Sequence, residues 1–190
     1  MGEEKNTKAG APTADAYTQR AYELFWEGRY GEALAAADAA LALNARHVRA
    51  LTTRAVTLVQ LGRAREAKAA AEEAIRLDPG DGVAYSILGF CYARLGDDDA
   101  AVAHFRRGIE TSPADYRVYY NCGSYWAELG NGGECRQYLV EALNLRPAMA
   151  KNLLIDPDFA RFSAEAWFRE LVAEYLARAR RETGAARGEP

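Results

Sequence analysis

The hydrophobic positions of the chain fall into short segments with helical spacing, and a glycine or a proline follows most of these segments. Apolar residues that recur every three or four positions predict amphipathic helices. A first set of helices is predicted to begin near residues 14, 48, 82 and 116 and to end at Gly28, Gly62, Gly96 and Gly130. A second set is predicted from two residues after each glycine to about residues 45, 79, 113 and 147. Glycine favours a left-handed C-terminal cap, and proline cannot continue a helix.

These signals repeat along the chain, because the four glycines are spaced by 34 residues. Small residues keep the same period at Ala33, Ala67, Ala101 and Cys135. Large residues keep it at Leu24, Leu58, Tyr92 and Trp126. Self-similarity at a fixed period is typical of stacked arrays. The sequence therefore predicts an all-α fold of stacked antiparallel helix pairs, in which the small residues let neighbouring helices approach closely.

The third unit is closest to a known repeat pattern. Its segment YSILGFCY at 85–92 precedes Ala101, Phe105 and Pro113, as in the pattern W-x2-L-G-x2-Y…A-x3-F…P. The fourth unit has YYNCGSYW at 119–126. Over roughly residues 14–147 the chain thus resembles the tetratricopeptide repeat family. The resemblance implies a right-handed α-solenoid.

The first two units depart from this pattern. Arg20 and Arg54 stand where the family has leucine, and Ala37 and Ala71 replace its large aromatic residue. We therefore expect the second helices of these two units to pack as slimmer elements.

The repeat also divides the chain into parts. The four units are expected to span 14–47, 48–81, 82–115 and 116–149, and the termini, 1–13 and 183–190, are expected to be disordered tails. Residues 148–182 are expected to cap the array, because a solenoid otherwise exposes its last apolar face.

Within this cap, residues 148–155 are predicted to form a short helix and residues 156–162 a turn. Ser163 is predicted as the N-cap of a helix over residues 164–183. The apolar stripe of that helix comprises Trp167, Phe168, Leu171, Val172, Tyr175 and Leu176. A lid on the solenoid explains this stripe, and a homodimer through this helix is the alternative.

Composition and charge exclude several classes of protein. The 190 residues are 49% hydrophobic and carry a net charge of −3, which points neither to nucleic acid nor to an anionic membrane. The start, MGEEKNTKAGAPTAD, lacks the apolar region of a signal peptide. No apolar run reaches the length of a membrane span. The expected location is the cytoplasm.

No catalytic or metal-binding motif emerges from the sequence. Cys91, Cys122 and Cys135 form no C-x-x-C pair, and His47 and His104 lack neighbours with ligand spacing. Phosphate-loop, nucleophile-elbow and H-E-x-x-H motifs are missing from the sequence. We therefore expect no enzymatic activity, no metal and no cofactor. Cys122 and Cys135 are interpreted as small buried fillers, with a pairing between them as the alternative.

The family resemblance implies that the first helices line a concave groove. By phase within each unit, the candidate groove residues are Tyr22, Phe25, Trp26, Arg49, Thr52, Val56, Val59, Ile87, Phe90, Arg94, Arg117, Tyr120 and Asn121. Chaperone-binding members of the family grip a C-terminal carboxylate with Lys, Asn and Arg at set places. Here those places hold Thr18, Tyr22, Thr53, Val83 and Ile87, so the resemblance predicts no such clamp.

The resulting track is apolar, which predicts an apolar or amphipathic peptide as ligand, with Arg49, Arg94 and Arg117 as polar anchors. Phe25 and Trp26 are in excess of the array's own core. A partner, the N-terminal tail or a second copy of the chain could cover them.

The leading hypothesis is a protein-interaction module or scaffold. The alternative is a secretion or assembly chaperone, since bacterial type III translocator chaperones resemble this arrangement of a short repeat array with an apolar groove. The Ala- and Arg-rich composition is compatible with a bacterium of high GC content.

Overall fold

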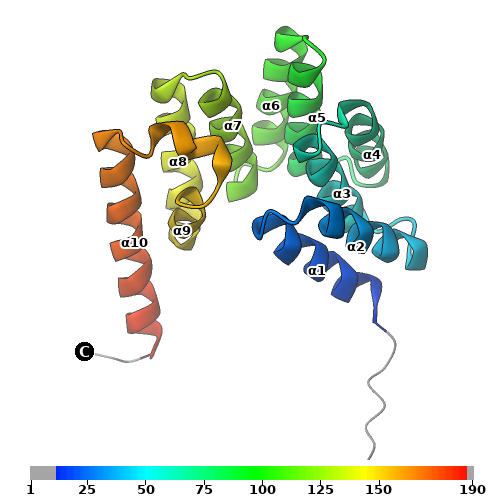
Figure 1. Cartoon of the computed structure of the whole chain (residues 1–190), viewed down its shortest axis with the longest axis horizontal. Helices are drawn as coiled ribbons and strands as arrows, with labels where there is room; N and C mark the ends of the chain where they lie inside the picture. The colour runs from blue at the N-terminus through cyan, green and yellow to red at the C-terminus, as the bar shows by residue number, and fades with distance from the viewer. Residues whose placement is uncertain (1–11, 188–190) are drawn as a thin grey trace, which may run out of the picture.

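The computed structural model describes residues 12–187, with side chains as far as Thr183. Within this range it contains helices and connecting turns but no strand. Eight helices form four antiparallel pairs: α1 (Ala14–Trp26) and α2 (Tyr30–Leu43), α3 (Val48–Gln60) and α4 (Ala64–Leu77), α5 (Gly82–Arg94) and α6 (Asp98–Thr111), α7 (Tyr116–Glu128) and α8 (Gly132–Leu145). The pairs stack into an arch whose blue first pair curls back toward the yellow and orange end (Figure 1). The predicted all-α array of helix pairs is confirmed.

The four repeated glycines end the first helices as predicted. They have φ between +72° and +83°, a region that residues with a Cβ adopt only with strain. After Gly28, the amide of Arg29 donates to the carbonyl of Leu24 at 2.9 Å, and the same bond recurs in the other three units. This is the Schellman arrangement, which satisfies carbonyls at the helix end.

The small residues of the repeat lie where helices touch. Ala33, Ala67, Ala101 and Cys135 are all fully buried. The first two units also bury Ala37 and Ala71, whereas the third buries the larger Phe105 at the equivalent place. Gly89 makes room for that ring, because a Cβ at this position would lie 2.8 Å from Phe105. The slimmer second helices expected in the first two units are thus present.

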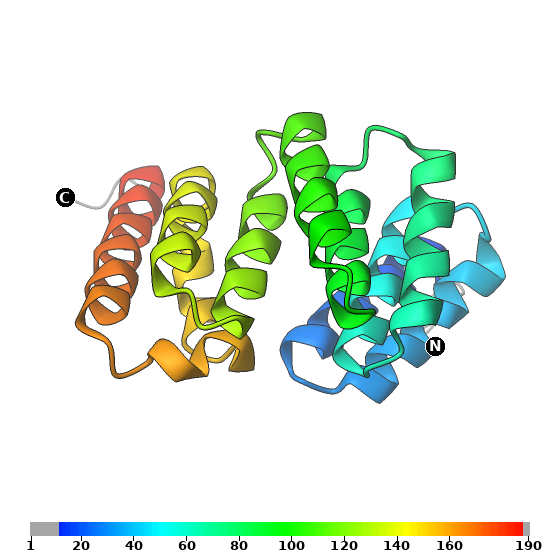
Figure 2. The same ribbon diagram turned by 90° about the horizontal axis from the view of Figure 1, so that it is seen from above.

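The cap consists of η1 (Pro147–Met149), α9 (Ala150–Leu153), η2 (Pro157–Phe162) and α10 (Ala166–Arg187). Figure 2 shows α10 standing beside α8 at the end of the row. Phe168, Leu171, Val172 and Tyr175 are buried in a cluster with α8 and α9 residues. This packing agrees with the predicted lid on the solenoid. It leaves little of the apolar stripe of α10 exposed for contact with a second copy of the chain.

Four details of the predicted C-terminal region are wrong. The short helix ends at Leu153, and the turn at 156–162 is largely a 3-10 helix. Ser163 is not an N-cap, because it has helical backbone angles at the end of η2 while α10 begins three residues later. The tail predicted over 183–190 is helical as far as Arg187. The remaining tail positions, 1–11 and 188–190, lie outside the described residues.

Every helix in the described part of the chain is too short or too polar to traverse a lipid bilayer.

Candidate functional site

The inner side of the arch carries a groove lined by side chains from α1, α3, α5 and α7. Residues three or four apart share a helix face, so each of these helices presents several side chains to the same space. All thirteen residues that the sequence predicted for this face line the groove: Tyr22, Phe25, Trp26, Arg49, Thr52, Val56, Val59, Ile87, Phe90, Arg94, Arg117, Tyr120 and Asn121. Their convergence is a structural fact, and their role in binding stays a prediction.

Five of the thirteen are nearly inaccessible and form the floor of the groove. The exposed fractions are 0% for Ile87, 3% for Val59, 4% for Thr52 and 6% for both Phe90 and Tyr120. Phe90 packs edge-on against Phe105 of α6, with ring centroids 5.3 Å apart. It therefore belongs to the core between α5 and α6, whereas Val56 is only half-buried and offers apolar surface to a ligand.

The first and fourth units touch across the groove. The hydroxyls of Tyr22 and Tyr116 lie 3.3 Å apart, and the rings of Trp26 and Tyr120 meet at nearly right angles with centroids 5.7 Å apart. Sequence reasoning missed both contacts and expected a tail, a second copy or a partner to cover Trp26. In the structure the chain's own fourth unit covers much of Trp26. Whether the N-terminal tail adds to this cover is a question about residues outside the described range.

These contacts leave the groove narrow. Its open volume is about 80 Å³, against roughly 300–1,000 Å³ for typical ligand pockets. The indole Nε1 of Trp26 is buried and has no hydrogen-bond acceptor among the described residues. A buried donor without an acceptor costs free energy, so an acceptor brought by a ligand would be favoured there.

The cap supplies groove residues that the repeat phase could not reveal. Met149 and Asp158 line the groove, although the sequence assigned both to the cap. The Ser124 hydroxyl donates to the Asp158 carboxylate, and the Tyr120 hydroxyl donates to Asp156 at 2.8 Å. Burial, together with the nearby charge of Asp158, raises the pKa of Asp156 to about 6. This edge of the groove is therefore acidic and rich in aromatic rings.

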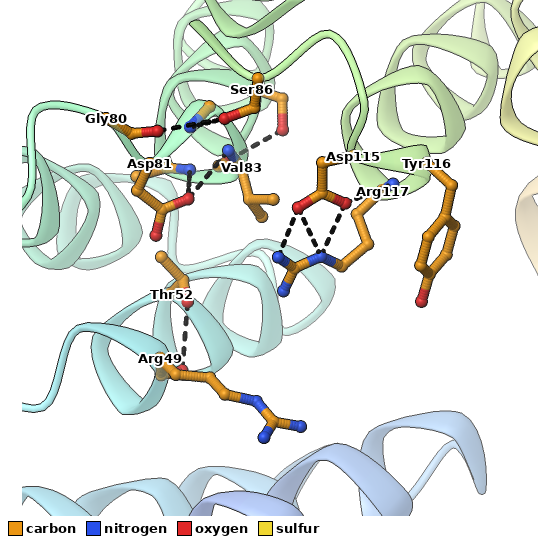
Figure 3. A network of polar contacts seen from close by, with 12 residues as sticks. Arg49, Thr52, Gly80, Asp81, Val83, Ser86, Asp115, Tyr116 and Arg117 are labelled. Carbon is orange, nitrogen blue, oxygen red and sulfur yellow. Dashed lines mark hydrogen bonds and ion pairs between the residues drawn. The ribbon is translucent and has the colours of Figure 1, made fainter. Parts of the chain in front are cut away.

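The opposite edge, where the first helices begin, is basic. Figure 3 shows Arg49 on α3 and Arg117 at the start of α7, on either side of one space, with the Tyr116 ring beside them. Arg117 donates to Asp115, with its Nε 3.0 Å from Oδ1. Arg146 donates to the Tyr116 hydroxyl at 3.2 Å. Tyr116 and Arg146 escaped the sequence prediction because neither occupies a place that the family uses for its groove.

The predicted polar anchors differ in how free they are. Arg94 pairs with Glu128, and Arg117 pairs with Asp115. Arg49 instead donates to the side-chain oxygen of Gln19 at 3.1 Å. An arginine already held by a carboxylate gains less from an added anion, so Arg49 is the most available of the three.

The cysteines are not paired with one another. Cys91, Cys122 and Cys135 are free and buried, as their interpretation as fillers requires. Burial raises the pKa of each thiol to about 12, so the reactive thiolate is scarce at neutral pH. Among the described residues, no group of three His, Cys, Asp or Glu side chains is arranged to hold a metal ion.

Comparisons with known proteins agree with this architecture. Residues 52–116 match the family model described as Tetratricopeptide repeat, while no curated protein matches the sequence. The chain is similar in structure to TTC0263, a thermophilic protein of Thermus thermophilus, at 19% identity over 87% of this chain and 100% of that one, with a TM-score of 0.58. It is also similar to MamA, at 22% identity over 76% and 84% of the two chains, with a TM-score of 0.52.

A third similar structure is the first repeat domain of Spaghetti (RPAP3), bound to the HSP90 peptide SRMEEVD. The two share 19% identity over 71% of this chain and 97% of that one, with a TM-score of 0.51. At such identities the likeness concerns the fold. The family match spans most of the second unit and all of the third, and the same glycine-capped helix pair recurs in all four units. The chain is a tetratricopeptide repeat protein.

Proposed function

We propose that this protein is a non-enzymatic interaction module that binds an apolar or amphipathic peptide segment of a partner protein in its concave groove. The observation that carries the proposal is the convergence of apolar side chains from all four first helices on one groove. Stacked helix pairs commonly act by presenting such a surface. The similar RPAP3 domain is bound to a peptide, which adds support at the level of the fold.

Binding in this groove requires that the first and fourth units separate, because the open volume is too small for a peptide. The side-chain contacts that oppose this separation include the Tyr22–Tyr116 hydroxyl contact, the ring contact of Trp26 with Tyr120 and the packing of Trp26 against the cluster that contains the cap residues. A bound segment would replace them with apolar contacts of its own, and its backbone carbonyls would offer Trp26 an acceptor.

A substitution at Val56 tests the proposal. Peptides of about 16 residues, long enough to cross the four first helices in an extended form, would be selected from a random displayed library with the full-length chain. Their affinities would be measured by fluorescence anisotropy. Val56→Asp is expected to abolish binding of the selected peptides, because it places a charge on the accessible apolar wall. Phe90 is unsuitable, since it is part of the core.

The matched control is Val102→Asp. Val102 is also half-buried but lies on α6, outside the groove. Both variants would first be compared with the wild type by circular dichroism. Equal affinity of the Val56→Asp variant and the wild type would contradict the proposal.

A further inference from the structure

A second, larger hollow lies beside the basic edge of the groove. It has a volume of about 800 Å³, and its lining includes Arg49, Arg117 and Arg146 together with Gln19, Asp115 and Tyr116. Tyr22, Arg49, Tyr116 and Arg117 line both the hollow and the apolar groove. The two spaces are therefore adjacent, and one extended ligand could occupy both once the hydroxyls of Tyr22 and Tyr116, 3.3 Å apart, have separated.

The hollow carries an excess of positive charge. Three arginines line it against a single carboxylate, that of Asp115. Asp115 already pairs with Arg117. Arg49 and Arg146 form no ion pair among the described residues, and they donate instead to the Gln19 amide and the Tyr116 hydroxyl. Two guanidinium groups thus face the hollow without an ion-pair partner in the described part of the chain, although Asp115 lines the same hollow.

Each of these two guanidinium groups lies over an aromatic ring. Arg49 lies 6.0 Å from the centroid of the Tyr22 ring, and Arg146 lies 4.9 Å from that of Tyr116. Stacking on a ring limits the rotation of the guanidinium plane, while the N–H groups at its edge stay available. A planar guanidinium with free edges is the donor that best matches a carboxylate.

The other edge of the groove has the opposite charge. Asp158 lines it, and Asp156 accepts hydrogen bonds from the Asp158 amide and the Tyr120 hydroxyl. An acidic ligand end is repelled there and attracted at the hollow, so charge fixes the direction in which a segment lies across the groove.

We infer that the occupant is a segment of a partner protein in which an apolar stretch adjoins acidic side chains. Its carboxylates pair with Arg49 and Arg146 in the hollow, and its apolar side chains contact Phe25 and Val56. This inference rests on the proposed function, because it specifies the chemistry of the peptide that the groove binds.

The test uses the same random library of displayed peptides and the full-length chain. The wild type is expected to select peptides with an apolar stretch and with Asp and Glu enriched on one side of it. The double variant Arg49→Ala/Arg146→Ala is expected to select apolar peptides without that enrichment. For a selected acidic peptide, this variant should raise the Kd roughly tenfold, as the loss of two partly exposed ion pairs implies.

Two further variants sharpen the result. Arg65→Ala/Arg136→Ala removes two arginines that lie outside both spaces and should leave the Kd unchanged. Arg49→Lys/Arg146→Lys keeps the charge and should recover part of the affinity, because ammonium groups still attract carboxylates but lack the planar fork.

The outcomes separate the two proposals. Selection of apolar peptides without acidic bias, with a Kd that Arg49→Ala/Arg146→Ala does not change, would overturn this inference and leave the proposed function standing. Failure to select any peptide would overturn both. A marked rise in affinity for acidic peptides in the full chain carrying Glu3→Lys/Glu4→Lys would identify the chain's own N-terminal segment as the occupant and would overturn the assignment to a partner.

Discussion

Trp26 in the first unit lies edge-on against the ring of Tyr120 in the fourth, with the ring planes at 80° and the centroids 5.7 Å apart. These residues are far apart in sequence, and the helix pairs between them set their distance. Trp26 also packs against the same cluster as the cap residues. The contact therefore closes the arch, and it couples the stability of the first unit to that of the last.

We expect a double-mutant cycle between Trp26→Leu and Tyr120→Leu to give a coupling energy of about 1 kcal/mol, typical of an edge-to-face aromatic pair. The free energies of unfolding would be measured by urea denaturation of the four proteins. Strictly additive effects would show that the two rings are not in contact in solution. The control is a second double-mutant cycle between Tyr17 and Tyr85, which lie on the first helices of different units. The effects of these two substitutions on the free energy of unfolding should be additive.

The period of the sequence determines most of the fold. The spacing of Gly28 and its three counterparts locates the ends of the first helices. The left-handed cap at each end depends on one glycine, and a glycine is visible in the sequence. The same phase places Val56 and Phe90 on one face, since the helical repeat determines which residues share a side. Local rules succeed here because each unit contacts mainly its neighbours.

The contacts across the arch could not be predicted in this way. The approach of Tyr22 to Tyr116 depends on the curvature of the stack, which is the sum of small rotations between successive pairs. The position of Asp158 depends on how the cap folds back after α9, where the repeat no longer applies. The prediction of Ser163 as an N-cap is wrong because no local signal indicates that a 3-10 helix extends to Phe162.

Gly89→Ala should destabilise the third unit. The added Cβ would lie 2.8 Å from the Phe105 ring, and such overpacking costs about 1–3 kcal/mol. The double variant Gly89→Ala/Phe105→Leu should recover part of the loss, because a smaller side chain relieves the clash. Thermal and urea unfolding would measure both effects.

Gly31→Ala is the matched control for this substitution. Gly31 lies in the first turn of α2, where an added Cβ would meet open space, and alanine has the higher helix propensity. The variant should be as stable as the wild type or slightly more stable. If Gly31→Ala lowered the free energy of unfolding as much as Gly89→Ala does, the steric explanation would be contradicted.

The cysteines should resist thiol reagents in the folded protein. Burial raises the pKa values of Cys91, Cys122 and Cys135 to about 12, and reaction requires both a thiolate and access. Labelling with iodoacetamide at neutral pH should be slow in buffer and fast in guanidinium chloride, as followed by mass spectrometry. Rapid labelling of the folded chain, or a disulfide between Cys122 and Cys135 in the purified protein, would contradict this prediction.

The stability of the protein should depend on the protonation of Asp156. The raised pKa of about 6 means that the folded chain binds a proton more tightly than the unfolded chain, in which the carboxyl has its usual pKa near 3.8. Between these two pKa values the folded state therefore holds more protons, and its free energy of unfolding falls as the pH rises. Between about pH 4 and pH 7, the titration of this carboxyl should lower the free energy of unfolding by an amount on the order of 2 kcal/mol.

Asp156→Asn separates this contribution from those of other groups. In the wild type, the Asp156 carboxylate accepts hydrogen bonds from the Tyr120 hydroxyl and from the backbone N–H of Asp158. The uncharged asparagine side chain can still interact with both groups. Urea denaturation of the two proteins from about pH 4 to pH 7 should show that the variant loses less stability as the pH rises. Asp99→Asn, at an exposed position of α6, should follow the wild-type profile. Parallel profiles for Asp156→Asn and the wild type would show that this carboxyl does not titrate in the range that its burial implies.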